Sequence, residues 1–154
     1  MTIERSFCPC CGYPTLSKRI DPQMSEWDIC VLCNWEDDGQ DDSFADVVRG
    51  GPNGIYSLTQ ARENFKKYLV MYYPDNDTRI MPGNWPGELE AKQLLVKCFE
   101  ELRATDDEPT KQSLWQEVLK LEDKLDNITS EKIREYEARI KDKATAPKLC
   151  RLYE

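Results

Sequence analysis

The amino-acid sequence predicts an α+β fold, in which a small cysteine-rich module is followed by a helical region. In residues 1–56, short segments of alternating apolar and polar side chains lie between closely spaced cysteines, and this alternation is typical of strands. From residue 57 onward, apolar side chains recur every three or four positions, as in amphipathic helices. We therefore divide the chain into residues 1–56 and 57–154.

The cysteine spacing predicts a metal site in the first part. Cys8 and Cys11 are separated by two residues, as are Cys30 and Cys33, and eighteen residues lie between the pairs. A two-residue insert lets a tight turn present both thiolates to one cation, and the longer loop brings in the second pair. We expect these four cysteines to bind one structural zinc ion, which leaves no open position for catalysis.

The first pair lies in the motif CPCCG, which has the form of a zinc knuckle. Pro9 presets the turn, and Gly12 is able to take a positive φ there. Cys10 is then the spare cysteine, because a pair that used it would need a shorter and less usual insert. Cys98 falls in an apolar helical pattern and is expected to be a core residue. The sequence assigns no role to Cys150.

Two other uses of the cysteines stay open but are disfavoured. A redox C-x-x-C motif requires a helix directly after it, and Pro14 with the polar residues that follow argues against one. An iron–sulfur cluster also uses four thiolates, but paired knuckles with a loop of this length more often hold zinc. Between the knuckles, YPTLSKRI and SEWDICVLC read as two strands of a hairpin that turns at Asp21 and Pro22, which predicts a zinc ribbon.

These motifs resemble the cysteine-rich CPCC family of small bacterial proteins. The resemblance covers about residues 6–66 and rests on CPCCGYPTL, CVLCNWEDDGQD, GGPNG and SLTQARENF, in that order. It implies a zinc-ribbon-like module. Such proteins are similar in style to the immunity proteins whose genes lie beside those of bacterial toxins. The chain departs from a regular second knuckle at Val31, where a proline would match Pro9, so this knuckle is expected to be looser.

The net charge of −8 is concentrated in a short acidic segment. Residues 36–56 hold six acidic residues and one basic residue, so this segment repels phosphate and attracts a basic partner. An aromatic anchor beside these acids predicts a protein-binding surface, although a solvated acidic loop and a divalent-cation site are alternatives. The candidate partner-binding residues are Trp35, Glu36, Asp37, Asp38, Asp41 and Asp42.

The spacing of apolar residues in residues 57–154 predicts four helices. The first follows a capping box at Ser57 and ends before Pro74, and the second runs from about Pro86 to the TDDEP segment. The third and fourth are expected over 110–127 and 130–144. With a stop near residue 127, they would form a helical hairpin, which we favour over a homodimer through these helices.

The amino-acid composition excludes several classes of function. Histidine is absent, which removes the Ser-His and Cys-His pairs of many hydrolases. No apolar run is long enough for a membrane span or a signal peptide, so we expect a cytoplasmic protein with no membrane contact. We predict a non-enzymatic immunity or antitoxin-type protein that binds a basic toxin or effector domain encoded nearby. A zinc-ribbon nucleic-acid-binding or regulatory protein is the alternative, and a metal-dependent hydrolase is less favoured.

Overall fold

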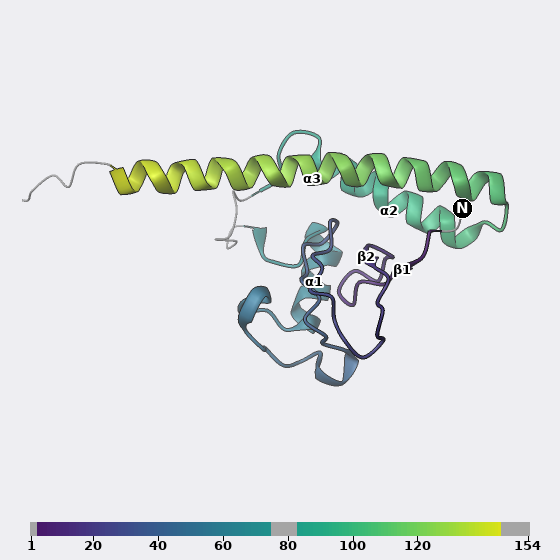
Figure 1. Cartoon of the computed structure of the whole chain (residues 1–154), viewed down its shortest axis with the longest axis horizontal. Coiled ribbons are helices and arrows are strands. Elements are labelled where there is room, and N and C mark those ends of the chain that lie inside the picture. Colours follow the sequence, from purple (N-terminus) through teal and green to yellow (C-terminus); the bar gives the residue numbers. More distant parts are fainter. Residues whose placement is uncertain (1–2, 75–82, 146–154) are drawn as a thin grey trace, which may run out of the picture.

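The computed structural model describes residues 3–74 and 83–145. These residues form an α+β structure with a small irregular N-terminal module and a layer of helices (Figure 1). The elements are β1 (Arg5–Ser6), β2 (Leu16–Ser17), the 3₁₀ turns η1 (Asp42–Phe44) and η2 (Gly51–Asn53), α1 (Leu58–Tyr68), α2 (Glu88–Ala104) and α3 (Glu108–Thr145).

The N-terminal module pairs its strands differently from the predicted hairpin. β2 pairs antiparallel with β1, and the second cysteine pair lies inside a separate bridge between Ile29 and Glu36. Each knuckle is therefore the tip of its own short hairpin, whereas the sequence predicted one hairpin between them. The predicted turn does form, since Asp21 accepts hydrogen bonds from the peptide N–H groups of Gln23 and Met24.

Helix α1 begins as predicted and ends early. Ser57 and Gln60 form the reciprocal capping box, with N···O distances of 2.9 and 3.1 Å. The helix ends at Tyr68 because Leu69 takes the left-handed conformation at φ 55°. The apolar pattern of the sequence continues toward Pro74, but in the structure the side chains after Leu69 belong to an irregular segment that packs on the module.

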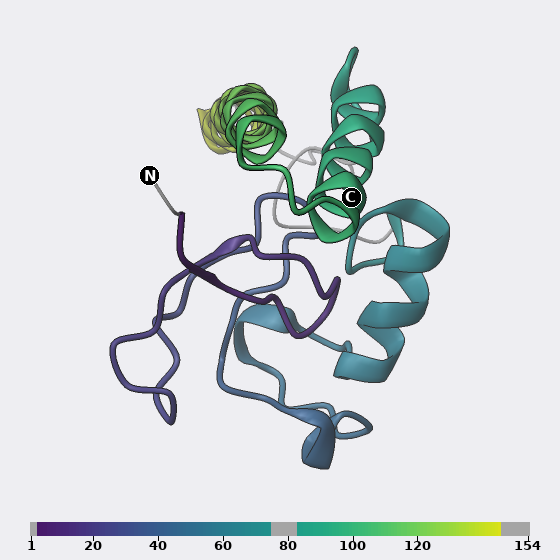
Figure 2. The same cartoon turned by 90° about the vertical axis from the view of Figure 1, so that its right-hand side faces the viewer.

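Helices α2 and α3 form an antiparallel hairpin that covers one side of the module, as the end-on view in Figure 2 shows. The prediction of two helices after residue 108 is wrong, because α3 continues without a break through Asn127. Asparagine lowers helix stability by less than about 1 kcal/mol, which packing readily offsets, and no glycine or proline lies between Pro109 and residue 145. The helical hairpin therefore consists of α2 and α3.

The C-terminal part of α3 extends beyond α2. At about 1.5 Å per residue, the 38 residues of α3 make it roughly twice as long as the 17 residues of α2. Figure 1 shows this part continuing past the rest of the molecule. Lys132 is its last buried residue among those described, and Ile133 and Ile140 are 39 and 49% exposed.

One hydrophobic core joins the two predicted parts of the chain. Tyr13 of the first knuckle stacks on Phe99 of α2, with ring centroids 5.4 Å apart, and its hydroxyl donates to Glu100. Arg5 on β1 forms a two-pronged ion pair with Glu122 on α3 at 2.5 and 2.9 Å. The main buried apolar side chains are Tyr13, Leu16, Leu32, Trp35, Leu58, Phe65, Met71, Leu95, Phe99, Val118, Leu121 and Leu125.

Within residues 3–74 and 83–145, none of the helices combines the length and the apolar character that crossing a membrane requires.

Candidate metal centre

The first knuckle is a tight backbone turn around Cys8. The peptide N–H of Cys8 donates to the carbonyl of Tyr13 at 2.9 Å, and the N–H of Gly12 donates to the carbonyl of Cys8 at 2.8 Å. Gly12 has a φ of 77°, the left-handed region that glycine adopts without steric cost. The positive φ predicted for Gly12 is confirmed, and the turn closes between Cys8 and Tyr13.

The second knuckle repeats the same backbone pattern around Cys30. The N–H of Cys30 donates to the carbonyl of Trp35 at 2.9 Å, and the N–H of Asn34 donates to the carbonyl of Cys30 at 2.8 Å. Asn34 takes the place of the glycine with a φ of 66°, which asparagine tolerates better than most residues. The second knuckle is therefore as closely hydrogen-bonded as the first, although Val31 stands where the first has a proline.

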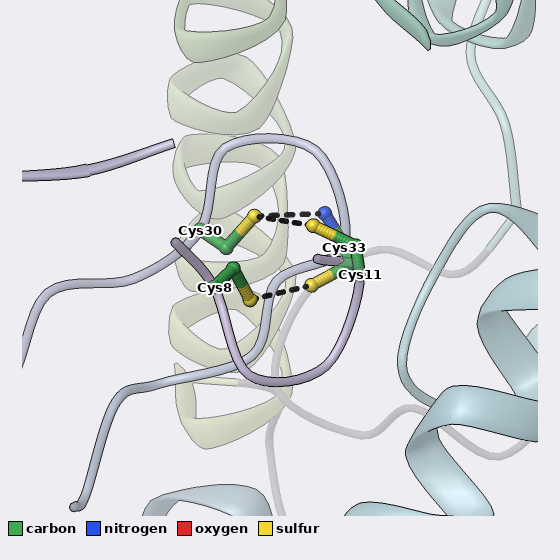
Figure 3. Close-up of side chains that lie close together, drawn as sticks. All are labelled: Cys8, Cys11, Cys30 and Cys33. Carbon is green, nitrogen blue, oxygen red and sulfur yellow. Dashed lines mark hydrogen bonds between the residues drawn. The ribbon is translucent and has the colours of Figure 1, made fainter. Parts of the chain in front are cut away.

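The four predicted ligand cysteines lie together. The sulfur atoms of Cys8, Cys11, Cys30 and Cys33 are all within 4.8 Å of one another. Figure 3 shows the four side chains directed toward a common centre. The Sγ atoms of Cys8 and Cys33 are 3.6 Å apart, and those of Cys11 and Cys30 are 3.7 Å apart. A tetrahedral ion with metal–sulfur bonds of about 2.3 Å requires sulfur–sulfur distances of about 3.8 Å. The cluster therefore has the dimensions of a four-thiolate metal site.

Cys30 receives two further contacts from outside the cluster of thiols. The hydroxyl of Thr15, next to β2, lies 2.9 Å from the Cys30 sulfur, and the peptide N–H of Cys33 lies 3.4 Å from it. When Cys30 is a thiolate, both groups donate to it, because a thiolate has no proton to give. Sequence analysis missed Thr15. Its only signal is a hydroxyl residue four positions after Cys11, which by itself indicates nothing about metal binding.

The thiols perturb one another strongly. Burial raises the pKa of Cys30, but hydrogen bonds from the other three cysteines and from Thr15 outweigh it, and the pKa falls well below the usual thiol value. Contact with Cys30 raises the pKa of Cys11, and burial raises that of Cys33. Hydrogen bonding to Cys11 lowers the pKa of Cys8, but contact with Cys30 and burial raise it on balance. The directions of these shifts make Cys30 the most acidic of the four thiols.

The remaining cysteines lie outside this cluster. Cys10 is buried, with 6% of its surface exposed, and it is not among the four residues whose sulfur atoms converge. Cys98 lies on α2 and is 8% exposed, in agreement with its prediction as a core residue. Cys150 lies outside the described residues. A metal at the centre would therefore be held by the outer two cysteines of CPCC and by the second pair.

The second knuckle is hydrogen-bonded to the segment that follows α1. The peptide N–H of Met71 donates to the carbonyl of Cys33 at 2.7 Å, and the side-chain amide of Asn34 donates to the hydroxyl of Tyr72 at 3.1 Å. Met71 is itself fully buried. The segment after α1 therefore packs along the knuckle and fixes its position relative to the helices.

A buried charge network lies behind this segment. Glu88 on α2 pairs with Lys132 of α3 at 2.6 Å and with Lys92 at 3.8 Å, and its carboxylate also accepts the N–H of Trp85. Lys92 donates to the carbonyl of Leu69 at the end of α1. Burial lowers the pKa of Lys92, an effect that the Glu88 carboxylate partly offsets. The network thus connects all three helices through charged side chains that are almost fully buried.

The predicted partner-binding residues do not form one surface. Trp35 is 0% exposed and belongs to the core, so its interpretation as an exposed anchor is wrong. Asp37 is 2% exposed, and its carboxylate pairs with Arg19 at 2.5 Å. These two residues follow the second knuckle directly, and the bridge between Ile29 and Glu36 turns them inward. In the sequence, a tryptophan next to several acidic residues suggests an exposed site. In the structure, the side chain of Trp35 is buried in the core.

The other acids are spread along the surface. Asp38 accepts from the backbone and side-chain amides of Gln40, Asp41 caps η1, and Asp42 pairs with Arg62 at 2.7 Å. Glu36 is half-buried. Within the described ranges, the four cysteines are the only group of three or more potential ligands placed to share a metal ion. The alternative of a divalent-cation site in the acidic segment therefore gains no support.

The fold and the cluster define a class: a small double-knuckle module with a four-cysteine site for a metal ion, joined to a helical layer. Residues 6–81 match the family model described as cysteine-rich CPCC. No curated protein and no solved structure matches the chain significantly. The predicted resemblance to this family is confirmed. The long hairpin of α2 and α3 lies beyond the matched residues.

Proposed function

We propose that this chain is a zinc-stabilised, non-enzymatic protein-binding module of the immunity or antitoxin type. The observation that carries the proposal is the closed cluster of four converging sulfurs, three of which belong to cysteines with no more than 1% of their surface exposed. When all four positions of a tetrahedral ion are filled by thiolates, no position remains for water or substrate. Such a site stabilises a fold and leaves recognition to the surface around it.

Zinc is the ion that best fits these ligands. Four thiolates in a tetrahedral arrangement are typical of structural zinc, and a cytoplasmic setting would keep the cysteines reduced. Elemental analysis of the purified chain should give one zinc per chain. The change Cys30→Ser should abolish zinc binding and unfold the N-terminal module, whereas Cys10→Ser should leave the stoichiometry unchanged. If elemental analysis instead finds iron and the protein absorbs visible light by charge transfer, the site holds an iron–sulfur cluster and the zinc assignment is wrong.

The distribution of charge supports a basic protein partner. The segment 36–56 carries a net charge of −5, and several of its carboxylates are exposed, including Asp41 and Asp42. Negative charge around a binding surface accelerates encounter with a positive protein and opposes encounter with nucleic acid. The C-terminal part of α3, whose described residues after Lys132 are exposed or half-buried, offers a further contact surface that a homodimer would use.

The decisive experiment uses the product of the neighbouring gene. The zinc-loaded chain and that product are purified, mixed and analysed by size-exclusion chromatography with light scattering, and the pair is co-expressed in a toxicity assay. We expect a stable complex and loss of toxicity. Absence of a complex, together with binding of DNA or RNA oligonucleotides in a gel-shift assay, would favour the alternative of a nucleic-acid-binding protein.

A further inference from the structure

The loop between the two knuckles carries an unusual concentration of exposed apolar side chains. Ile20, Met24, Trp27 and Ile29 are 93, 63, 58 and 62% exposed, and all four lie within ten residues. In Figure 2 this loop projects from the module on the side away from α2. Single exposed apolar residues are common, but four large ones in one short loop are typical of an interaction site. We call residues 20–29 the apolar loop.

Trp27 is the central residue of this loop. Its backbone φ is 56°, a left-handed conformation that a bulky side chain rarely adopts. The residue that follows it is held by two hydrogen bonds: the Asp28 side chain accepts the N–H of Ser17 at 2.7 Å, and the Asp28 carbonyl accepts the N–H of Asp37 at 2.8 Å. The indole is therefore presented on a fixed base. Tryptophan is among the residues that contribute most to protein interfaces.

The charges around the apolar loop are mostly acidic. Arg19, whose guanidinium donates to the carbonyl of Pro22, is the basic residue in contact with the loop, and it is paired with Asp37. The loop contains Asp21, Glu26 and Asp28 and no basic residue. The loop lies beside the acidic segment of residues 36–56. A Cβ atom placed on Gly39 of that segment would lie 3.8 Å from the Cβ atom of Ser25. Within the described part of the chain, no lysine or arginine pairs with the side chains of Asp21, Glu26 or Asp38. The charge available to a partner at this surface is thus negative.

We propose that the apolar loop is the docking surface for a cationic, amphipathic protein segment, with Trp27 as its apolar anchor. The proposal rests on the proposed function and names the chemistry of the partner. Apolar side chains of that segment cover Ile20, Met24 and Trp27, while its lysines and arginines lie against the acids around them. Phosphate-bearing partners, such as nucleic acids and anionic lipid surfaces, carry the wrong charge for this rim.

The test measures binding of the zinc-loaded full chain to a labelled synthetic amphipathic peptide of leucine and lysine, about eighteen residues long. Fluorescence anisotropy should show binding that weakens as salt is raised. Trp27→Asn should weaken binding about tenfold or more, because it removes the anchor. Asparagine tolerates the left-handed backbone, so folding and zinc content should be unchanged. A peptide in which glutamate replaces lysine should not bind.

A matched control separates this surface from general stickiness. Leu94→Ser removes an apolar side chain of similar exposure on α2, and it should leave the affinity for the peptide unchanged. Equal affinity of the native chain and Trp27→Asn would overturn the proposal. So would a preference for duplex DNA, for RNA, or for vesicles containing phosphatidylserine over the basic peptide.

The neighbouring gene product distinguishes the two proposals. If it forms a complex that Trp27→Asn does not weaken, the docking surface is wrong and the immunity-type function stands. If the basic peptide binds at Trp27 while the neighbouring product forms no complex, the docking surface stands and the immunity-type function is wrong.

Discussion

The hydroxyl of Thr15 offers a sharp test of the metal centre. It lies 2.9 Å from the Cys30 sulfur and, in the metal-bound state, donates to a thiolate. The change Thr15→Val removes the hydroxyl and keeps the branched shape. Hydrogen bonds to charged groups are worth about 1.5 to 3 kcal/mol. The loss corresponds to a zinc dissociation constant roughly tenfold to a hundredfold larger, the range found when outer hydrogen bonds to metal ligands are removed.

The assay is competition for zinc against a chromophoric chelator at fixed pH. Thr15→Ser keeps the hydroxyl and should restore most of the affinity. Thr59→Val serves as the matched control, since the hydroxyl of Thr59 donates to Asp46 at the surface. Native affinity in Thr15→Val, or equal losses in the valine and serine variants, would refute the reasoning that the hydroxyl holds the thiolate.

Three further predictions concern the buried charges, the thiols and the long helix. Glu88→Gln leaves the buried ammonium groups of Lys92 and Lys132 without their carboxylate and should lower the free energy of unfolding by about 3 to 5 kcal/mol in urea denaturation; a loss below about 1 kcal/mol would contradict the burial of these charges. Three of the four cluster thiols have a raised pKa, so zinc must displace protons from them and its apparent affinity should fall steeply on acidification, as measured by chelator competition; a pH-independent affinity would show that the thiols are already ionised. Asn127→Ala should raise the free energy of unfolding by about 0.5 kcal/mol and Asn127→Gly should lower it, because residue 127 is helical; the opposite order would indicate a helix end there.

The cysteine spacing was sufficient to predict the metal centre. A knuckle is a local structure, and its turn residues, Pro9 and Gly12, stand next to the ligands in the chain. The capping box at Ser57 is equally local, since its two hydrogen bonds join residues three positions apart. Features of this kind depend on few long-range contacts, so they can be predicted from the local sequence pattern.

The errors concern features that distant contacts decide. Trp35 is buried in the core that the module shares with the helices, and nothing in its own sequence neighbourhood indicates that burial. Asn127 was read as a helix end on its intrinsic preference, which is weaker than the packing of Leu121 and Leu125 just before it. Trp27 received no role, although its exposure makes it the more available indole of the two.

The hydrogen bond from Met71 to Cys33 has a consequence for how long the protein would persist in a cell. It ties the second knuckle to the segment that follows α1, so loss of the proposed zinc should loosen both together. Partly unfolded chains are the form that proteases degrade. If the proposed zinc is bound, we therefore expect zinc starvation to shorten the lifetime of the whole chain, and zinc supply would then set how much folded protein is present.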